Sequence, residues 1–160
     1  MKSREQTESK ILEAVASIVE SDGFEKLGIN TIALKANVSK MLIYRYFGGL
    51  EELVARFIMQ KDYWANTDTL ILNPHSVGDS IKSMFRNQIE QLRNDVTLRR
   101  LCRWELSCHN ASIDRLRDKR EENGCNLIKV VSRLTGCSNS EVASLASILS
   151  ASISYLTLIE

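Results

Sequence analysis

Residues 31–53, TIALKANVSKMLIYRYFGGLEEL, constrain the fold more than any other stretch, because they place two short helical patterns on either side of a tight turn. Ile32, Ala33 and Ala36 have the spacing of the inner face of a short packed helix. Asn37 follows, and asparagine tolerates the left-handed backbone that ends a helix and turns the chain sharply. The first pattern therefore predicts a short helix that stops at about residue 37.

A second short helix is expected directly after this turn, with Val38 filling the turn and the Ser39 hydroxyl capping the helix. Ile43 and Phe47 lie four residues apart and are expected to face inward. This arrangement is typical of a helix-turn-helix, whose second helix lies in the DNA major groove. An ordinary helical hairpin with exposed aromatic residues is the alternative that spacing alone leaves open. The side chains left largely outside are Lys40, Met41, Leu42, Tyr44, Arg45 and Tyr46.

These outward side chains suit contacts with a DNA duplex. Basic groups and tyrosine hydroxyls bind phosphate oxygens, whereas Met41 and Leu42 suit base edges such as the thymine methyl group. Residues 1–56 hold eight Lys or Arg and eight Asp or Glu, so this segment is electrically balanced. No acid lies between Lys35 and Arg45, which predicts a local basic patch and a modest dependence of binding on salt.

The composition favours an all-α fold. The 160 residues include one proline and seven glycines, so long helices can continue without interruption, and alternating β-branched residues are scarce. Apolar residues make up 44% of the chain, which is enough to build a core. The sequence shows no apolar leader and no uncharged apolar stretch of membrane-spanning length. We therefore expect a soluble, cytoplasmic protein without a membrane partner.

Helical periodicity extends along the rest of the chain. We expect helices at about residues 3–22, 50–64, 76–94, 96–108, 112–134 and 138–160, with a loop at 66–76. The almost wholly charged run at 115–123 is interpreted as a solvated helix face. The four cysteines form no C-x-x-C pair, and we expect them to be reduced and mostly buried.

The segment from about Lys10 to Leu53 resembles the N-terminal DNA-binding domain of the tetracycline-repressor (TetR) family of transcriptional regulators. The resemblance implies a three-helix helix-turn-helix DNA-binding domain at residues 1–48. A helical ligand-binding and dimerisation domain is then expected at residues 49–160. The resemblance rests on the apolar first helix, Gly23-Phe24, Ile32-Ala33, Ala36, Val38-Ser39, Tyr44 with Phe47, and Glu51-Glu52-Leu53.

The resemblance also implies roles within the helix-turn-helix, where Asn30 occupies a position that contacts bases or phosphates. Family members often have a hydroxyl residue where this chain has Gly28, and usually a backbone-binding lysine where it has Leu50. Leucine predicts that one charge contact with DNA is missing. The assigned phosphate contacts are Ser39, Tyr44, Arg45 and Tyr46, the assigned base contacts are Asn30, Lys40, Met41 and Leu42, and Lys35 completes the DNA-binding candidates.

Residues 140–160 contain one stripe of leucine and isoleucine and a second stripe of small residues. Small residues at this spacing let another helix approach closely, either within the chain or across a symmetric dimer. In the resembled family the last two helices form the dimer, which a reader of paired DNA half-sites needs. The sequence stops mid-pattern at Glu160, where one more helix is expected, so either the chain is unusually short or its tail is missing.

A small-molecule effector in the C-terminal helices is a further implication of the resemblance. The predicted helices supply the aromatic and polar residues of a mostly apolar pocket, although each aromatic residue equally suits a plain core position. The sequence does not identify the effector. The ligand-binding candidates are Trp64, Phe85, Arg86, Trp104, Glu105 and His109.

Catalytic motifs are absent from the sequence, which has no G-x-S-x-G, P-loop, H-E-x-x-H or G-x-G-x-x-G pattern. Cys102, Cys108 and His109 lack an obvious fourth metal ligand, so we expect no metal, no cofactor and no enzyme. We predict a ligand-responsive transcriptional regulator, a repressor, that binds double-stranded operator DNA as a homodimer. The alternative is a helical small-molecule-binding protein with weakened or lost DNA binding.

Overall fold

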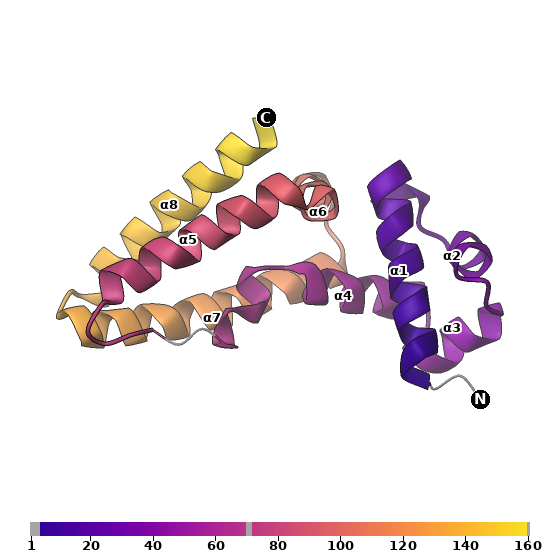
Figure 1. The fold of residues 1–160 in the computed structure, drawn as a ribbon, viewed down its shortest axis with the longest axis horizontal. Helices are drawn as coiled ribbons and strands as arrows, with labels where there is room; N and C mark the ends of the chain where they lie inside the picture. The colour runs from indigo at the N-terminus through magenta and orange to yellow at the C-terminus, as the bar shows by residue number, and fades with distance from the viewer. Residues whose placement is uncertain (1–3, 70–71, 160) are drawn as a thin grey trace.

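The computed structural model describes residues 4–69 and 72–159, and every regular element in these residues is helical. Figure 1 shows a small group of helices, α1 to α3, at one end and a bundle of longer helices at the other. The expected all-α fold is confirmed. The elements are α1 (Arg4–Asp22), η1 (Phe24–Lys26), α2 (Ile29–Ala36), α3 (Lys40–Phe47), α4 (Leu50–Lys61), η2 (Trp64–Thr69), α5 (Val77–Asn94), α6 (Val96–Ser107), α7 (Ala111–Thr135) and α8 (Asn139–Ile159).

The turns between the N-terminal helices have the backbone conformations that the sequence predicts. Asn37 adopts the left-handed conformation, with φ 52° and ψ 52°, at the end of α2. Gly23 ends α1 with φ 92°, and a Cβ atom built there would lie 2.7 Å from Glu25 Oε2. Ser39 occupies the N-cap of α3, but its side chain makes no capping hydrogen bond. The expected Ser39 cap is therefore wrong, and its hydroxyl is exposed.

Helix α4 ends at Lys61, three residues before the predicted end, because Asp62 leaves the helix to begin the next turn. The Ala65 N–H donates to Asp62 Oδ1 at 2.7 Å, and residues 64–69 form the 3-10 helix η2 where a loop was expected to begin. This side chain fixes the direction of the chain at the junction between α4 and the C-terminal helices.

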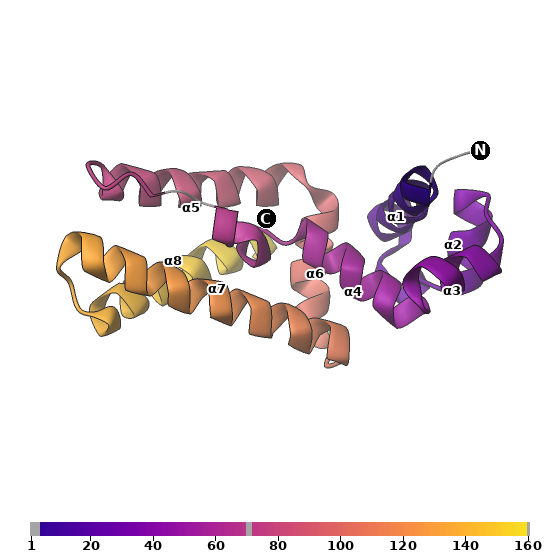
Figure 2. The ribbon, with the colours of Figure 1, turned by 90° about the horizontal axis from the view of Figure 1, so that it is seen from below.

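One core extends from α1 through α6 into the first turns of α7. Ile11, Ile32, Ile43, Leu101 and Leu116 all belong to it and have no exposed surface. A second, smaller core lies between α5, α7 and α8 around buried side chains such as those of residues 84 and 131. Helix α6 packs against both α1 and α8. Figure 2 shows α6 lying across the junction between the two ends of the molecule.

The charged run of α7 differs from the prediction. Leu116 is fully buried and Asn123 is 5% exposed, while the Arg120 side chain is 22% exposed and lies in ion pairs. The run is therefore solvated on one side only, because α7 packs against α4 and η2 along the other. The cysteine expectation is also wrong in part, since Cys125 and Cys137 are exposed, although all four thiols are free.

Within the described ranges, none of the helices combines the length and the apolar character that crossing a membrane requires.

Candidate nucleic-acid interface

The outer face of α3 gathers most of the predicted DNA contacts on one exposed surface. Met41 is 75% exposed and Tyr44 is 52% exposed. Ser39, Lys40 and Arg45 are also exposed, whereas Leu42 and Tyr46 are half-buried. Ile43 and Phe47 are buried beneath them, as the spacing predicts. This face has the mixture of basic, hydroxyl and apolar groups that a helix in a major groove presents.

Helix α2 contributes a second part of this surface. Asn30 and Lys35, which were predicted to contact DNA, are exposed on α2. Leu34 lies between them and is 85% exposed, although the sequence analysis did not single it out. The signal was present, because the inner face formed by Ile32 and Ala33 places residue 34 on the outside of the helix.

The inner side of α3 is held by an acidic residue of α1 and two arginines. Arg4 Nε donates to Glu8 Oε1 at 2.6 Å, and Arg56 Nη2 donates to Glu8 Oε2 at 2.8 Å. The Arg4 guanidinium lies 5.3 Å from the ring centroid of Tyr46, and that of Arg56 lies 5.2 Å from the ring centroid of Phe47. The hydrogen bond from Arg4, together with Arg56, holds the pKa of Glu8 below its usual value. Glu8 thus joins α1, α3 and α4.

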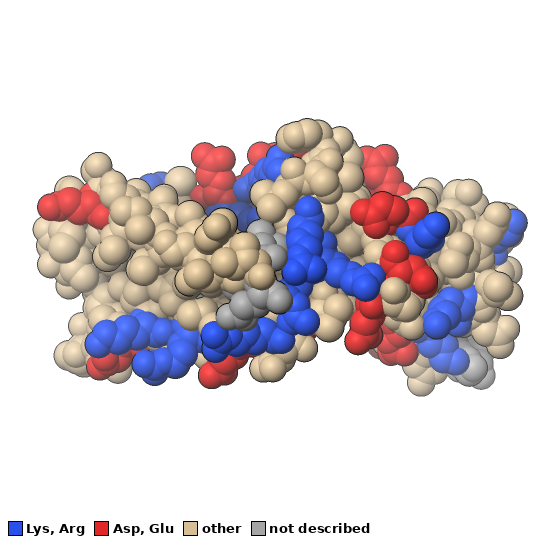
Figure 3. All heavy atoms as spheres, turned by 90° about the horizontal axis from the view of Figure 1, so that it is seen from above, with Lys and Arg blue, Asp and Glu red and all other residues tan. Residues whose placement is uncertain are grey.

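The charges on the exposed face are available to a ligand. Among the described residues, none forms an ion pair with Lys35, Lys40 or Arg45. Figure 3 shows acidic and basic side chains interspersed over the N-terminal end of the molecule, whereas a band of basic side chains extends over the C-terminal helices. The positive charge of the candidate interface is therefore local, in agreement with the balanced count in the sequence.

Leu50, which stands at the position of the family lysine, is half-buried and packs against the main core. It lies at the first residue of α4, two residues after the left-handed Gly48, whose φ is 84°. Its side chain therefore contributes packing at the end of the recognition helix and not a cationic contact.

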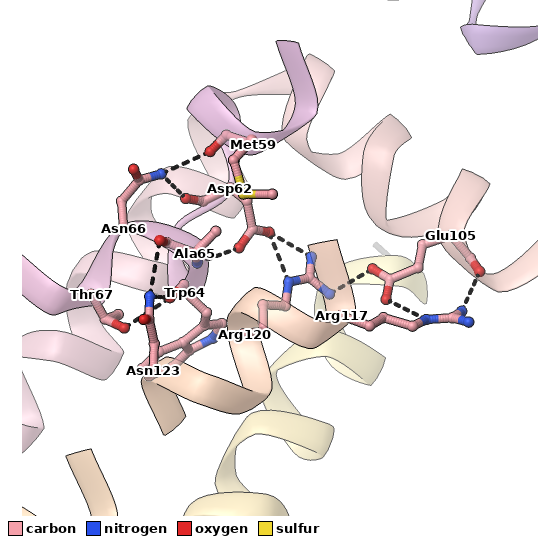
Figure 4. Close-up of polar contacts among 10 residues, drawn as sticks. All are labelled: Met59, Asp62, Trp64, Ala65, Asn66, Thr67, Glu105, Arg117, Arg120 and Asn123. Atoms are coloured by element: carbon pink, nitrogen blue, oxygen red, sulfur yellow. Dashed lines mark hydrogen bonds and ion pairs between the residues drawn. The ribbon is translucent and has the colours of Figure 1, made fainter. Parts of the chain in front are cut away.

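Helices α4, α6 and α7 meet in a network of ionised groups (Figure 4). Arg120 Nε donates to Asp62 Oδ2 at 3.0 Å, and Arg120 Nη1 donates to Glu105 Oε2 at 2.6 Å. Arg117 Nε donates to Glu105 Oε1 at 3.2 Å. Burial lowers the pKa of Arg120, but the hydrogen bonds and charges of Asp62 and Glu105 outweigh it and raise the pKa above its usual value. Arg120 therefore stays charged and joins the three helices.

Arg120 was not predicted to be an interior residue. Leu116, Arg120, Asn123 and Leu127 follow one another at the spacing of a single helix face, and this periodicity was the available signal. Asn123 Nδ2 donates to the backbone oxygens of Trp64 and Ala65 at 3.1 and 2.9 Å. The same face of α7 thus holds both ends of the turn between α4 and η2.

A mostly apolar cavity of about 650 Å³ lies between α5, α7 and α8. Such a volume is within the usual range of small-molecule sites. Trp64 and Phe85 line it, and their rings meet edge to face with centroids 5.6 Å apart. A smaller chamber of about 200 Å³ is lined by Glu105 and, again, by Trp64.

The remaining ligand-binding candidates lie away from both spaces. Trp104 stacks on Phe24, with ring centroids 4.5 Å apart and planes inclined by 7°. Arg86 and His109 are exposed, and neither lines the two cavities. In the part of the chain that the structure describes, no group of three or more His, Cys, Asp or Glu side chains could hold a metal ion.

Comparison with known proteins agrees with this geometry. The family model for bacterial regulatory proteins of the tetR family matches residues 11–57, which contain most of α1, all of α2 and α3, and the first part of α4. Residues 11–57 therefore match the TetR family, and the chain is similar to regulators of that family. The matched segment includes the whole outer face of α3, so the family's helix-turn-helix domain coincides with the surface described above.

A curated relative is the HTH-type transcriptional regulator BetI of Vibrio atlanticus (strain LGP32), which is 26% identical over 119 residues. The match covers 71% of this chain and 60% of that relative, so the chain spans less than two thirds of its length.

Two solved structures share the fold of this chain. A linker variant of HlyIIR, a hemolysin II transcriptional regulator, superimposes with a TM-score of 0.67 at 19% identity, covering 92% of this chain and 85% of that one. NalD, the secondary repressor of the MexAB-OprM multidrug efflux pump in Pseudomonas aeruginosa, superimposes with a TM-score of 0.60 at 15% identity, covering 96% and 84%. These likenesses extend the shared architecture to the C-terminal helices.

Proposed function

We propose that this TetR-family chain is a ligand-responsive transcriptional repressor in the cytoplasm that binds operator DNA as a homodimer. The observation on which this rests is the exposed face of α3, where Lys40 and Arg45 have no ion-pair partner among the described residues and Met41 and Tyr44 are open to solvent. Ser39, Tyr44, Arg45 and Tyr46 bind phosphates in this proposal, and Asn30, Lys40, Met41 and Leu42 face base edges. Lys35 adds positive charge at the edge of the groove. The name of NalD, a repressor with the same fold, supports the repressor role.

The homodimer is supported by the outer side of α8. Leu145, Ile148, Tyr155, Leu156 and Ile159 are between 57% and 65% exposed on this one helix. An apolar helix face of this length is unfavourable in water and marks an interaction surface. A two-fold pair that meets along α8 buries the same face of both copies, and it provides the two recognition helices that paired half-sites need.

Ligand response is supported by the cavity between α5, α7 and α8 and by the way α6 contacts the N-terminal helices. Arg100 Nη1 donates to the backbone oxygen of Val19 at 2.8 Å, close to the stacked pair of Trp104 and Phe24. A ligand that shifts α6 or α7 therefore changes the position of α1 and, through α4, that of α3. Ligand and DNA then oppose each other through one coupling free energy, which each binding reaction experiences equally.

The competing proposal is a helical small-molecule-binding protein whose DNA binding is weakened. The observation that favours it is Leu50, which packs into the core where the family usually provides a lysine for the DNA backbone. The two proposals share the cavity and differ in whether the face of α3 binds a duplex.

A gel-shift titration against the DNA upstream of its own gene, at two salt concentrations, tests the proposal. The chain is expected to bind tightly, and Arg45→Gln is expected to reduce the slope of log K against log salt concentration by about 0.9 for each phosphate that the variant no longer neutralises. Lys26→Gln is the matched control, because Lys26 is an exposed lysine of the same end of the chain but lies on η1. Absence of a shift at low salt would favour the ligand-binding protein without DNA binding.

A further inference from the structure

One buried polar atom next to the cavity has no partner. Gln88 lies on α5, is 4% exposed, and its Oε1 atom has no hydrogen bond within the described part of the chain. Burying an amide oxygen without a hydrogen bond is unfavourable, so such atoms in folded proteins have a bound water, an ion or a ligand as a partner. Gln88 lines the 200 Å³ chamber between α5, α6 and α7.

The chamber borders the larger apolar cavity. Trp64, Arg120 and Ser154 line both spaces, so the chamber and the cavity of about 650 Å³ are adjacent. The larger space is bordered mainly by apolar side chains such as those of Ile81 and Leu127. The combined space therefore has a long apolar part and a small end that contains Gln88.

Apart from the Ser154 hydroxyl, which also lines the chamber, the other polar side chains there already have partners or are neutral. Arg120 donates to Asp62 and Glu105, and Asp62 also accepts from the Ala65 N–H, as Figure 4 shows. The Tyr63 hydroxyl donates to the backbone oxygen of Met84 at 2.8 Å. Burial raises the pKa of the Cys102 thiol to about 11, so this group is neutral at physiological pH. Gln88 Oε1 is therefore the buried acceptor of the chamber that has no partner among the described residues.

The charges around both spaces disfavour an anionic ligand. Arg120 is the only Lys or Arg among the described residues that line them, and its guanidinium already has two carboxylate partners. Glu121 and Glu141 add negative charge to the border of the larger cavity. A carboxylate would enter without a cation to neutralise it, and this desolvation is costly.

From these contacts we infer that the effector is an elongated apolar molecule with a neutral hydrogen-bond donor, such as an alcohol, and that the donor binds Gln88 Oε1. The apolar body occupies the space between α5, α7 and α8, and the donor enters the chamber beside Cys102. This inference deepens the ligand response proposed above and rests on it. It names the ligand class and assigns Gln88 as the residue that selects it.

The test uses two isomers of equal size that differ in the donor. Octan-1-ol has a hydroxyl hydrogen, whereas 1-methoxyheptane has the same atoms and no donor. Isothermal titration of the full chain is expected to give an affinity for octan-1-ol roughly three- to tenfold higher than for the ether, which corresponds to one hydrogen bond. Octanoate is expected to bind more weakly than octan-1-ol. Equal affinity for the two isomers, stronger binding of octanoate, or no binding of the three compounds overturns the inference.

Two variants test whether Gln88 causes the preference for octan-1-ol over the ether. Gln88→Met keeps the length of the side chain and removes the acceptor, so it is expected to bind both isomers equally. Gln91→Met is the matched control on the exposed side of the same helix and is expected to keep the preference for the alcohol. A preference that persists in a folded Gln88→Met protein means that only a water binds Gln88, and it overturns the assignment. If Gln88→Met does not fold, Gln88→Asn, which shortens the acceptor, replaces it with the same expectation.

These titrations contain no DNA. Failure of the alcohol preference therefore leaves the DNA-binding proposal unchanged, and failure of the gel shift leaves the Gln88 assignment unchanged.

Discussion

Glu8 shows how a single carboxylate positions the recognition helix. It accepts hydrogen bonds from Arg4 and Arg56, and these two guanidinium groups lie over the rings of Tyr46 and Phe47 on α3. The carboxylate side chain is 11% exposed, whereas Arg4 and Arg56 are 66% and 44% exposed, so solvent screens both ion pairs. The contribution to stability is therefore modest, and the main effect is on the orientation of α3.

Replacing Glu8 by glutamine is expected to lower the free energy of unfolding at pH 7 by about 1 kcal/mol. Because the folded-state pKa of Glu8 is lowered, its contribution is fully present above the unfolded-state pKa and disappears as the pH falls through the folded-state value. The difference between Glu8→Gln and the parent chain should therefore shrink below about pH 4.3. Urea unfolding at a series of pH values measures this, with Glu20→Gln, an exposed acid of the same helix, as the control.

A difference between Glu8→Gln and the parent chain that stays constant through the acid range would contradict this assignment of the pH dependence.

A variant of Tyr44 tests the assignment of this residue to phosphate contacts rather than base contacts. Its hydroxyl is on the exposed face of α3, and Tyr44→Phe removes only this group. Binding is expected to weaken by about 1 kcal/mol, roughly fivefold, for the operator and for unrelated DNA alike, because a phosphate contact contains no sequence information. Met41→Ala is the contrasting variant and should change the ranking among operator variants. Competition gel shifts measure both, and a change in sequence preference alone for Tyr44→Phe would show that the assignment is wrong.

At the scale of elements, the ion pairs of Arg120 connect α4, α6 and α7. Its partner Asp62 ends α4 and is 3% exposed, and its partner Glu105 lies on α6. Removing one member of a buried ion pair leaves the other charge without compensation, which is far more costly than the net value of the pair. The ionic part of the junction between α4, α6 and α7 thus depends on one guanidinium group.

Arg120→Met is expected to lower the free energy of unfolding by about 3–5 kcal/mol, because Asp62 then stays buried without a partner. Arg117→Met, which removes a 39% exposed arginine from the same helix, should cost about 1 kcal/mol or less. Denaturant titration followed by circular dichroism measures both values. Adding Asp62→Asn to Arg120→Met should restore part of the stability, and an equal effect of the two single variants would contradict the role of burial.

At the scale of the whole molecule, the proposed dimer depends on the outer face of α8. The described residues of α8 include none that is fully buried, although the helix packs against α5, α6 and α7. Its apolar side chains are divided between a side that lines the cavity and a side that is open to solvent. The second side remains for a partner, and a symmetric pair is the arrangement that serves DNA half-sites.

Ile148→Lys places a charge within the open face of α8 and is expected to convert the dimer to a monomer at micromolar concentration, since an unpaired charge cannot be buried without a large penalty. Leu34→Lys is the matched control, because Leu34 is an apolar residue that is 85% exposed on α2, far from α8 in Figure 1. Sedimentation velocity distinguishes the two states. A parent chain that sediments as a monomer would contradict the dimer proposal before any variant is made.

The sequence by itself determined the helices and the exposed face of α3. The ends of α2, α3, α5 and α6 depend on local signals, such as Asn37 in the left-handed conformation and Asp95 Oδ1 accepting from the Leu98 N–H. The inward position of Ile43 and Phe47 follows from their spacing alone. Such features involve residues a few positions apart, so the local pattern contains the information that fixes them.

The tertiary structure alone decided which polar side chains lie inside. Arg120 bonds to Asp62, 58 residues earlier in the chain, and the charged run around it gave no indication that such a partner exists. Gln88 is buried without a partner among the described residues because α5, α6 and α7 meet around it, and Trp104 stacks on Phe24 because α6 crosses α1. Helical periodicity places Arg120 on the same face as Leu116, but the groups that pack against a buried polar side chain come from distant segments, and periodicity does not identify them.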